Sequence, residues 1–172
     1  MIISTNAGLW AYSIGDTVKF VSKNPYKIIV TGRIKHFISA FGEHVISEET
    51  EAAIKDACNE LNSEITEFHV APQVAPQNGE LPYHEWFIEF SKAPENLPQF
   101  ASKIDEVMCK KNIYYKDLIE GKILQKAKIT VVAKDTFRNY MKSEGKLGGQ
   151  NKLPRLANDR ILADKLTALQ PK

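Results

Sequence analysis

The stretch 26–47 constrains the fold of this chain more than any other part of the sequence. Its run 27–31, Lys-Ile-Ile-Val-Thr, is rich in β-branched residues, which favour a pleated strand. Gly32 follows, and glycine allows a backbone turn where a side chain would clash. The pattern therefore predicts a strand, a glycine-arginine turn carrying Arg33 and Lys35 to one exposed corner, a second short strand, a glycine turn and the start of a helix.

Three charged residues in this region have the chemistry of a nucleotide site. The Arg33 guanidinium and the Lys35 ammonium suit phosphate or ribose oxygens. Asp16 follows Gly15 where the strand 17–22 begins, and a carboxylate there can accept hydrogen bonds from two vicinal hydroxyls, as a ribose presents them. A solvated hairpin end and an ordinary Gly-Asp turn explain the same residues, so local chemistry leaves both interpretations open.

Length and composition predict one globular domain. The chain has 172 residues and a formal charge of +2, with its lysines scattered, which argues against a nucleic-acid-binding surface. Cys58 and Cys109 lie far apart in helical patterns and are expected to be reduced thiols, with neither a disulfide nor a zinc site. No apolar run is long enough to span a membrane, and the N-terminus lacks the charged-then-apolar pattern of a signal peptide. These features predict a cytoplasmic protein without membrane or nucleic-acid partners.

The remaining pattern predicts an α+β domain with a mostly antiparallel sheet covered by helices. Strands are expected at 17–22, 26–31, 64–71, 83–90 and 129–133. Helices are expected from Ser47, capped by its hydroxyl, and at 97–111, 113–120 and 136–142, with a last helix capped by Asn158.

Two further groups of residues suggest ligands without deciding the matter. The glycine-rich segment 143–155 carries Lys146, Lys152 and Arg155, and mobile loops of this kind often close over phosphate, although basic loops without a function are commoner. His69 and His84 could face each other on paired strands. Because no third ligand is in view, ordinary sheet residues are favoured over a metal pair.

Several motifs occur in an informative order along the chain. Together they resemble the C-terminal part of the adenylate-forming enzymes: Tyr12-Ser-Ile-Gly-Asp16, Gly32-Arg-Ile-Lys35 continuing through Ile38 to Gly42, and a lysine in the glycine-rich segment before Pro154-Arg155. A closer set resembles the bacterial branch of the auxin-responsive acyl-acid amido synthetases, the Gretchen Hagen family: Thr5-Asn-Ala-Gly-Leu-Trp10, Ile14-Gly-Asp16, Ile38-Ser39 and Asn151-Lys-Leu-Pro-Arg155. The resemblance covers essentially the whole chain.

The resemblance implies a ligase that joins a carboxylic acid to an amino acid, using ATP and Mg²⁺ in the complete enzyme, with no cofactor bound tightly by this chain. By motif, Asp16 would hold the ribose hydroxyls and Arg33 would support the nucleotide. Lys35 takes the position of the hinge residue, and Lys152 resembles the mobile catalytic lysine at the α-phosphate. Two departures are notable, since Ser39 replaces a common lysine and the segment around Lys152 lacks the usual Thr-Gly-Lys pattern.

The resemblance also implies that the chain is incomplete as an enzyme. Residues 1–34 would be a remnant β-hairpin, the terminal strands of a missing large N-terminal domain together with the approach to the hinge. Residues 35–172 would form the small mobile C-terminal domain. The large domain would then be its main partner. The alternative is a stand-alone protein-interaction or nucleotide-binding module, in which an open strand edge drives pairing into a homodimer.

Overall fold

The computed structural model describes residues 1–33, 37–148 and 151–170. At its centre lies a three-stranded sheet of β7 (Glu64–Gln73), β8 (Tyr83–Lys92) and β9 (Lys128–Val131). The strands β7 and β8 pair antiparallel, whereas β9 runs parallel to β8. A short 3₁₀ turn, η1 (Gln77–Gly79), interrupts the long connection between β7 and β8. The predicted strands at 64–71, 83–90 and 129–133 are confirmed, each with ends shifted by a few residues.

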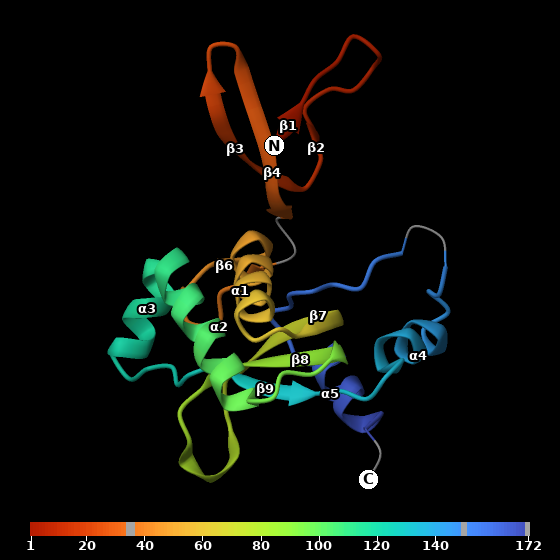
Figure 1. Ribbon diagram of the computed structural model, residues 1–172. Helices are drawn as coiled ribbons and strands as arrows, with labels where there is room; N and C mark the ends of the chain where they lie inside the picture. Colours follow the sequence, from red (N-terminus) through yellow and green to blue (C-terminus); the bar gives the residue numbers. More distant parts are fainter. Residues whose placement is uncertain (34–36, 149–150, 171–172) are drawn as a thin grey trace.

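Helices cover both faces of this sheet (Figure 1). On one face Trp86 and Ile88 join a core built with α1 (Ser47–Glu60), α2 (Leu97–Lys111) and α3 (Ile113–Glu120). On the other face Phe87 joins a second core with α4 (Thr136–Ser143) and α5 (Ile161–Ala168). Alternate side chains of β8 enter opposite cores because successive residues of a strand point to opposite faces. The predicted α+β class is confirmed.

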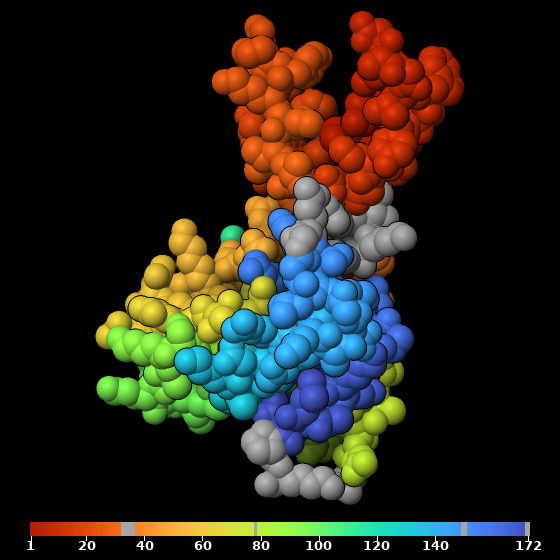
Figure 2. All heavy atoms as spheres, turned by 90° about the vertical axis from the view of Figure 1, so that its right-hand side faces the viewer, coloured from red at the N-terminus to blue at the C-terminus, as the bar shows by residue number. Residues whose placement is uncertain are grey.

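The N-terminal strands form two small hairpins that stand apart from this body. One joins β1 (Ile2–Ile3) to β2 (Tyr12–Ser13), and the other joins β3 (Asp16–Lys23) to β4 (Tyr26–Arg33). In the space-filling view they project as two separate lobes (Figure 2). The expected turn at Gly32 and Arg33 is wrong, because both residues belong to β4, whose pairing with β3 extends to its last residue.

A third short pair, β5 (Phe37–Ile38) and β6 (Val45–Ile46), leads into α1. Two predicted helix caps differ from the structure. Ser47 is the first residue of α1, and the Glu49 carboxylate accepts a hydrogen bond from the Ile46 N–H at 3.0 Å. The Asn158 Oδ1 accepts from the Ser39 N–H at 2.7 Å instead of capping α5. No helix in the described ranges is long and apolar enough to cross a membrane.

Two buried polar contacts tie the helical layer to the sheet and its neighbouring segments. The Asp105 carboxylate of α2 accepts from the Tyr115 hydroxyl at 2.6 Å and from the Ala127 N–H at 3.0 Å. Glu43, in the loop before β6, lies 2.9 Å from the Nε2 of His84 on β8. Because each of these side chains is buried, losing one partner leaves the other unsatisfied.

We therefore expect Tyr115→Phe to lower the free energy of unfolding by about 1–3 kcal/mol, because it removes one donor from the buried Asp105 carboxylate. The neighbouring Tyr114 lies on the same helix and is 62% exposed, against 1% for Tyr115. Tyr114→Phe is the matched control and should change stability by less than about 0.5 kcal/mol. Urea denaturation of both variants makes the comparison, and equal losses would contradict the expectation.

Candidate functional site

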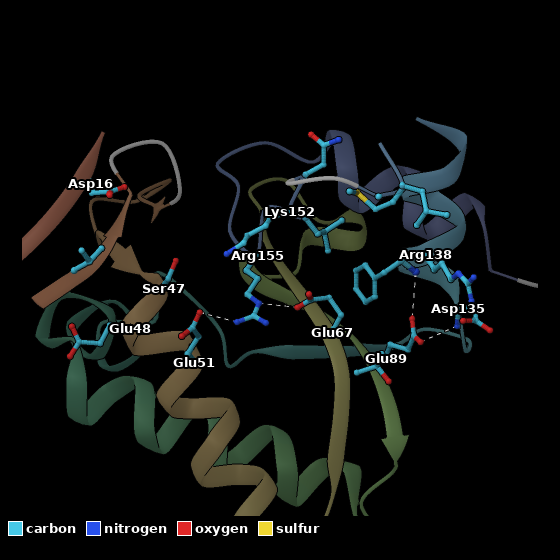
Figure 3. A pocket seen from close by; sticks show the side chains of 18 of the residues that line it. Asp16, Ser47, Glu48, Glu51, Glu67, Glu89, Asp135, Arg138, Lys152 and Arg155 are labelled. Atoms are coloured by element: carbon cyan, nitrogen blue, oxygen red, sulfur yellow. Dashed lines mark hydrogen bonds and ion pairs between the residues drawn. The ribbon is translucent and has the colours of Figure 1, made fainter. Parts of the chain in front are cut away.

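A cleft of about 1020 Å³ lies where the β3–β4 hairpin meets the body of the domain. Its walls come from β3 and β4, the start of α1, the strands β7 and β8, helix α4, and the segment that follows α4 (Figure 3). The lining is strongly charged, and its labelled acidic and basic side chains are Asp16, Glu48, Glu51, Glu67, Glu89, Asp135, Arg138, Lys152 and Arg155. Residues from both ends of the chain therefore share one cavity.

Strand pairing places two of the predicted site residues opposite each other. Asp16 is the first residue of β3, and its partner across the hairpin is Arg33, the last residue of β4. Gly15, with φ of +76°, precedes Asp16 in a backbone conformation that favours glycine. Asp16 lines the cleft at the end of the hairpin nearest the body. The position of the Arg33 side chain and the whole of Lys35 lie outside the described residues.

Lys152 enters the cleft from the opposite wall (Figure 3). Its side chain is exposed, and within the described part of the chain its ammonium makes no hydrogen bond or ion pair. An ammonium on a flexible four-carbon stem, without a protein partner, is available to an anion that enters the cleft. The structure thus brings Asp16 and Lys152 to one cavity, although 135 residues separate them in sequence.

Arg155, only three residues further on, is already paired. Its guanidinium contacts Glu51 of α1 and Glu67 of β7, each at 2.9 Å, and lies 5.0 Å from the centre of the Phe68 ring. Burial would lower the pKa of Arg155, but the two glutamates together raise it above its usual value. Arg155 therefore links α1 to β7, and its charge is balanced before any ligand enters.

The segment that carries both cations is anchored to the outer edge of β7. The Val70 N–H donates to the Arg155 carbonyl at 2.8 Å, and the Ala157 N–H donates to the Val70 carbonyl at 3.2 Å. Between them, Val70 and Leu156 form a parallel bridge. This pairing covers part of the strand edge and leads residues 151–153 into the cleft.

Glu89 supports the neighbouring wall. Its buried carboxylate on β8 accepts from the Asp135 N–H at 2.9 Å and from the Phe137 N–H at 3.5 Å, both at the start of α4. A carboxylate stabilises a helix N-terminus because the first N–H groups have no partner inside the helix. Glu89 thus holds in place the helix that precedes the glycine-rich segment.

The model of a family described as the GH3 family C-terminal domain matches residues 48–161, which is more than half of the chain. The chain belongs to this family. No curated protein matches the chain.

Solved structures of GH3 proteins share the fold. The chain is similar to a GH3.15 acyl acid amido synthetase with a TM-score of 0.76 and 18% identity, over 99% of this chain and 33% of that one. It is also similar to the AtGH3.15 acyl acid amido synthetase in complex with 2,4-DB, with a TM-score of 0.73 and 16% identity, over 99% of this chain and 32% of that one. The chain thus spans about a third of the length of these proteins.

The two sheet histidines of this GH3 domain do not face each other. In the register of β7 and β8, His69 pairs with Phe87, whereas His84 pairs with Pro72. His69 contacts the Phe87 ring, and His84 contacts the Tyr115 ring of α3. In the ranges that the structure describes, no three His, Cys, Asp or Glu side chains are grouped to hold a metal. Cys58 and Cys109 are free thiols.

Sequence reasoning missed several residues that shape the GH3 cleft. Glu51, Glu67 and Glu89 neutralise or anchor other groups, and His69 hydrogen-bonds to the Pro154 carbonyl. The one available signal was a polar residue within an otherwise apolar strand, as for His69 and Glu89. That signal indicates a buried partner without saying which residue it is.

We expect Glu89→Ala to lower the free energy of unfolding by about 1–3 kcal/mol, because two N–H groups at the start of α4 lose their acceptor. The exposed Glu95, which lies just before α2, provides the control. Glu95→Ala should have almost no effect. Chemical denaturation followed by circular dichroism would measure both, and an unchanged midpoint for Glu89→Ala would show that its carboxylate does not support α4.

The buried His69 should make stability depend on pH. Burial lowers its pKa to about 4, although the hydrogen bond to Pro154 acts in the opposite direction. In the unfolded chain, histidine has a pKa of about 6.5. Between these values the unfolded chain binds more protons, so the free energy of unfolding falls as the pH falls, by up to about 3 kcal/mol.

His69→Asn removes this titrating group while keeping a hydrogen-bond donor near the position of Nδ1. The difference in unfolding free energy between the wild type and this variant should therefore shrink as the pH falls from about 6.5 to about 4. Urea titrations at several pH values measure this difference. Parallel pH dependences of the two proteins would contradict the assignment of His69 as a buried neutral imidazole.

Proposed function

We propose that this chain is the C-terminal part of an ATP-dependent acyl-acid amido synthetase. Such an enzyme first activates a carboxylic acid as its acyl-adenylate and then forms an amide with an amino acid. The observation that carries the proposal is a single cleft with the Asp16 carboxylate on one wall and, on another, the Lys152 ammonium, which has no partner among the described residues. Membership of the GH3 family and the fold shared with acyl acid amido synthetases support the same reaction class.

We infer an orientation for the nucleotide from these residues. The Asp16 carboxylate would accept hydrogen bonds from the two ribose hydroxyls, and Arg33, its partner across the hairpin, would support the nucleotide nearby. Lys152 would then approach the α-phosphate from the other wall. The cleft volume of about 1020 Å³ lies just above the usual range for ligand pockets, about 300–1,000 Å³, which is ample for a nucleotide.

Lys152 would act in the first step, the formation of the acyl-adenylate. A carboxylate oxygen of the acid forms a bond to the α-phosphorus, the bond from that phosphorus to the β-phosphate bridging oxygen breaks, and pyrophosphate leaves. Negative charge develops on the phosphoryl oxygens, and an ammonium placed there stabilises it. In the second step the amine nitrogen bonds to the acyl carbon, AMP leaves with the bonding pair, and the nitrogen loses a proton.

We assign no Mg²⁺ ligand among the described residues of this chain. The described residues hold no group of three metal-ligating side chains, and the Glu51 and Glu67 carboxylates near Lys152 are occupied by Arg155. Any Mg²⁺ would enter with the phosphates that it accompanies.

The remaining parts of the active site would come from a large N-terminal domain. Residues 1–34 would belong structurally with that domain, and residues 35–172 would swing about Lys35 between the two half-reactions. The exposed apolar side chains of the β3–β4 hairpin fit this arrangement, since Phe20, Tyr26 and Val30 are all more than half exposed. The enzyme would work in the cytoplasm.

The N-terminal hairpin of β1 and β2 favours one alternative function. Its exposed apolar residues Ile2, Trp10 and Tyr12 could instead pair two copies of the chain, as in a stand-alone interaction module. Sedimentation distinguishes the two, because a module of this kind would be a dimer that becomes monomeric when residues 1–16 are removed.

We expect the isolated chain to show only background carboxylate-dependent exchange between ATP and pyrophosphate.

In the complete enzyme, Lys152→Ala should lower the rate of adenylation by about 100-fold or more. Asp16→Ala should mainly raise the KM for ATP, because ribose binding is shared by the ground state and the transition state. The exposed Lys146, which does not line the cleft, gives the matched control Lys146→Ala. Robust exchange by the isolated chain would overturn the proposal that it is incomplete.

A further inference from the structure

His69 is a buried polar side chain of β7, between the buried apolar residues Phe68 and Val70. It has no exposed surface, and its Nδ1 lies 2.8 Å from the carbonyl oxygen of Pro154. A carbonyl oxygen only accepts hydrogen bonds, so Nδ1 must carry the proton and donate it. The other ring nitrogen, Nε2, is buried and has no partner among the described residues. The ring thus makes one directed hydrogen bond while a second polar atom stays unsatisfied.

Among the hydrogen bonds of the described residues, this bond is the closest in sequence to Lys152. Downstream of it, the segment is held by the two backbone bonds between Val70 and residues 155–157. Upstream, the described residues 151–153 make no backbone hydrogen bond, and Leu153 is held only by apolar packing against the α4–α5 core. Lys152 therefore lies two residues before Pro154, whose carbonyl is held by His69.

Stability alone does not account for an imidazole at this position. A buried nitrogen without a partner costs free energy, and an apolar side chain of similar size would avoid that cost. What an apolar side chain would lose is the hold on the Pro154 carbonyl. The backbone bonds of Val70 would still secure residues 155–157, so the loss would fall on residues 151–153 in particular.

We propose that His69 is a positioning residue for Lys152: by donating its Nδ1–H to the Pro154 carbonyl, it fixes where residues 151–153 enter the cleft. This inference rests on the function proposed above for Lys152. His69 touches no substrate. Its effect on the reaction passes through the main chain to the lysine that contacts the phosphate.

The first test measures the backbone motion of residues 152 and 153 in the isolated chain, independently of activity. Two variants separate the bond from the ring: His69→Leu removes the donor, whereas His69→Asn keeps an N–H donor at the same number of bonds from the main chain. We expect backbone order parameters of Lys152 and Leu153 to fall from about 0.8 in the wild type to below about 0.6 in His69→Leu, with recovery in His69→Asn. Tyr115→Phe, which destabilises the opposite face of the sheet, should leave them unchanged.

The second test is a double-mutant cycle in the complete enzyme. His69→Leu should lower the kcat of adenylation about tenfold with little change in the KM for ATP, and His69→Asn should restore it to within about threefold. In the Lys152→Ala background, His69→Leu should cause no further loss, because a residue that acts through Lys152 has nothing left to position.

The outcomes separate the two proposals. Unchanged order parameters in His69→Leu would overturn the positioning role, because the packing of Leu153 would then suffice. An equal kcat loss with and without Lys152 would overturn it as well. If Lys152→Ala left adenylation unchanged while the order parameters fell as expected, the proposed role of Lys152 would fail, and His69 would remain the residue that anchors the segment.

Discussion

The pairing of β7 with residues 155–157 is the contact on which the cleft depends. Both faces of the central sheet are buried, so a backbone N–H at its outer edge needs a protein partner. The Val70 N–H finds that partner in the Arg155 carbonyl, and the adjoining Leu156 is buried in the core beneath α1 and α2. The C-terminal segment is therefore folded back over the sheet. As a result, the residues just before it lie at the mouth of the cleft.

Two cations on neighbouring residues of the cleft, Arg155 and Lys152, differ in whether a protein carboxylate already balances their charge. Arg155 offers a rigid fork that contacts two carboxylates at once, and its charge is used in joining α1 to β7. Lys152 has a single flexible ammonium and keeps it free of the described protein groups. The acidic side chains around it shape the field of the cleft, and two of them are neutralised by Arg155. Lys152 is thus available to a ligand phosphate, as is Arg138, which also lines the cleft and makes no ion pair with a described residue.

The two parts of the molecule bury their apolar surface differently. The cores of the body draw on residues from Ile38 onward, whereas the hairpin residues Phe20 and Tyr26 remain 60% and 79% exposed. A two-stranded hairpin buries too little surface to be stable by itself. The exposed apolar side chains of the hairpin agree with the large partner domain proposed above.

The sequence by itself determined the local elements. The helix expected at 97–111 is α2, and the strands at 64–71 and 83–90 lie within β7 and β8, because side-chain periodicity reports burial directly. Only the tertiary structure decided which polar groups meet. Asn158 was expected to cap the last helix, but its side chain accepts a hydrogen bond from Ser39, which lies 119 residues away. Motif resemblance selected Asp16 and Lys152, but local patterns could not place them in one cleft. Such contacts depend on the register of the paired strands and on where the C-terminal segment folds back onto the sheet. The periodicity of the side chains encodes neither of these.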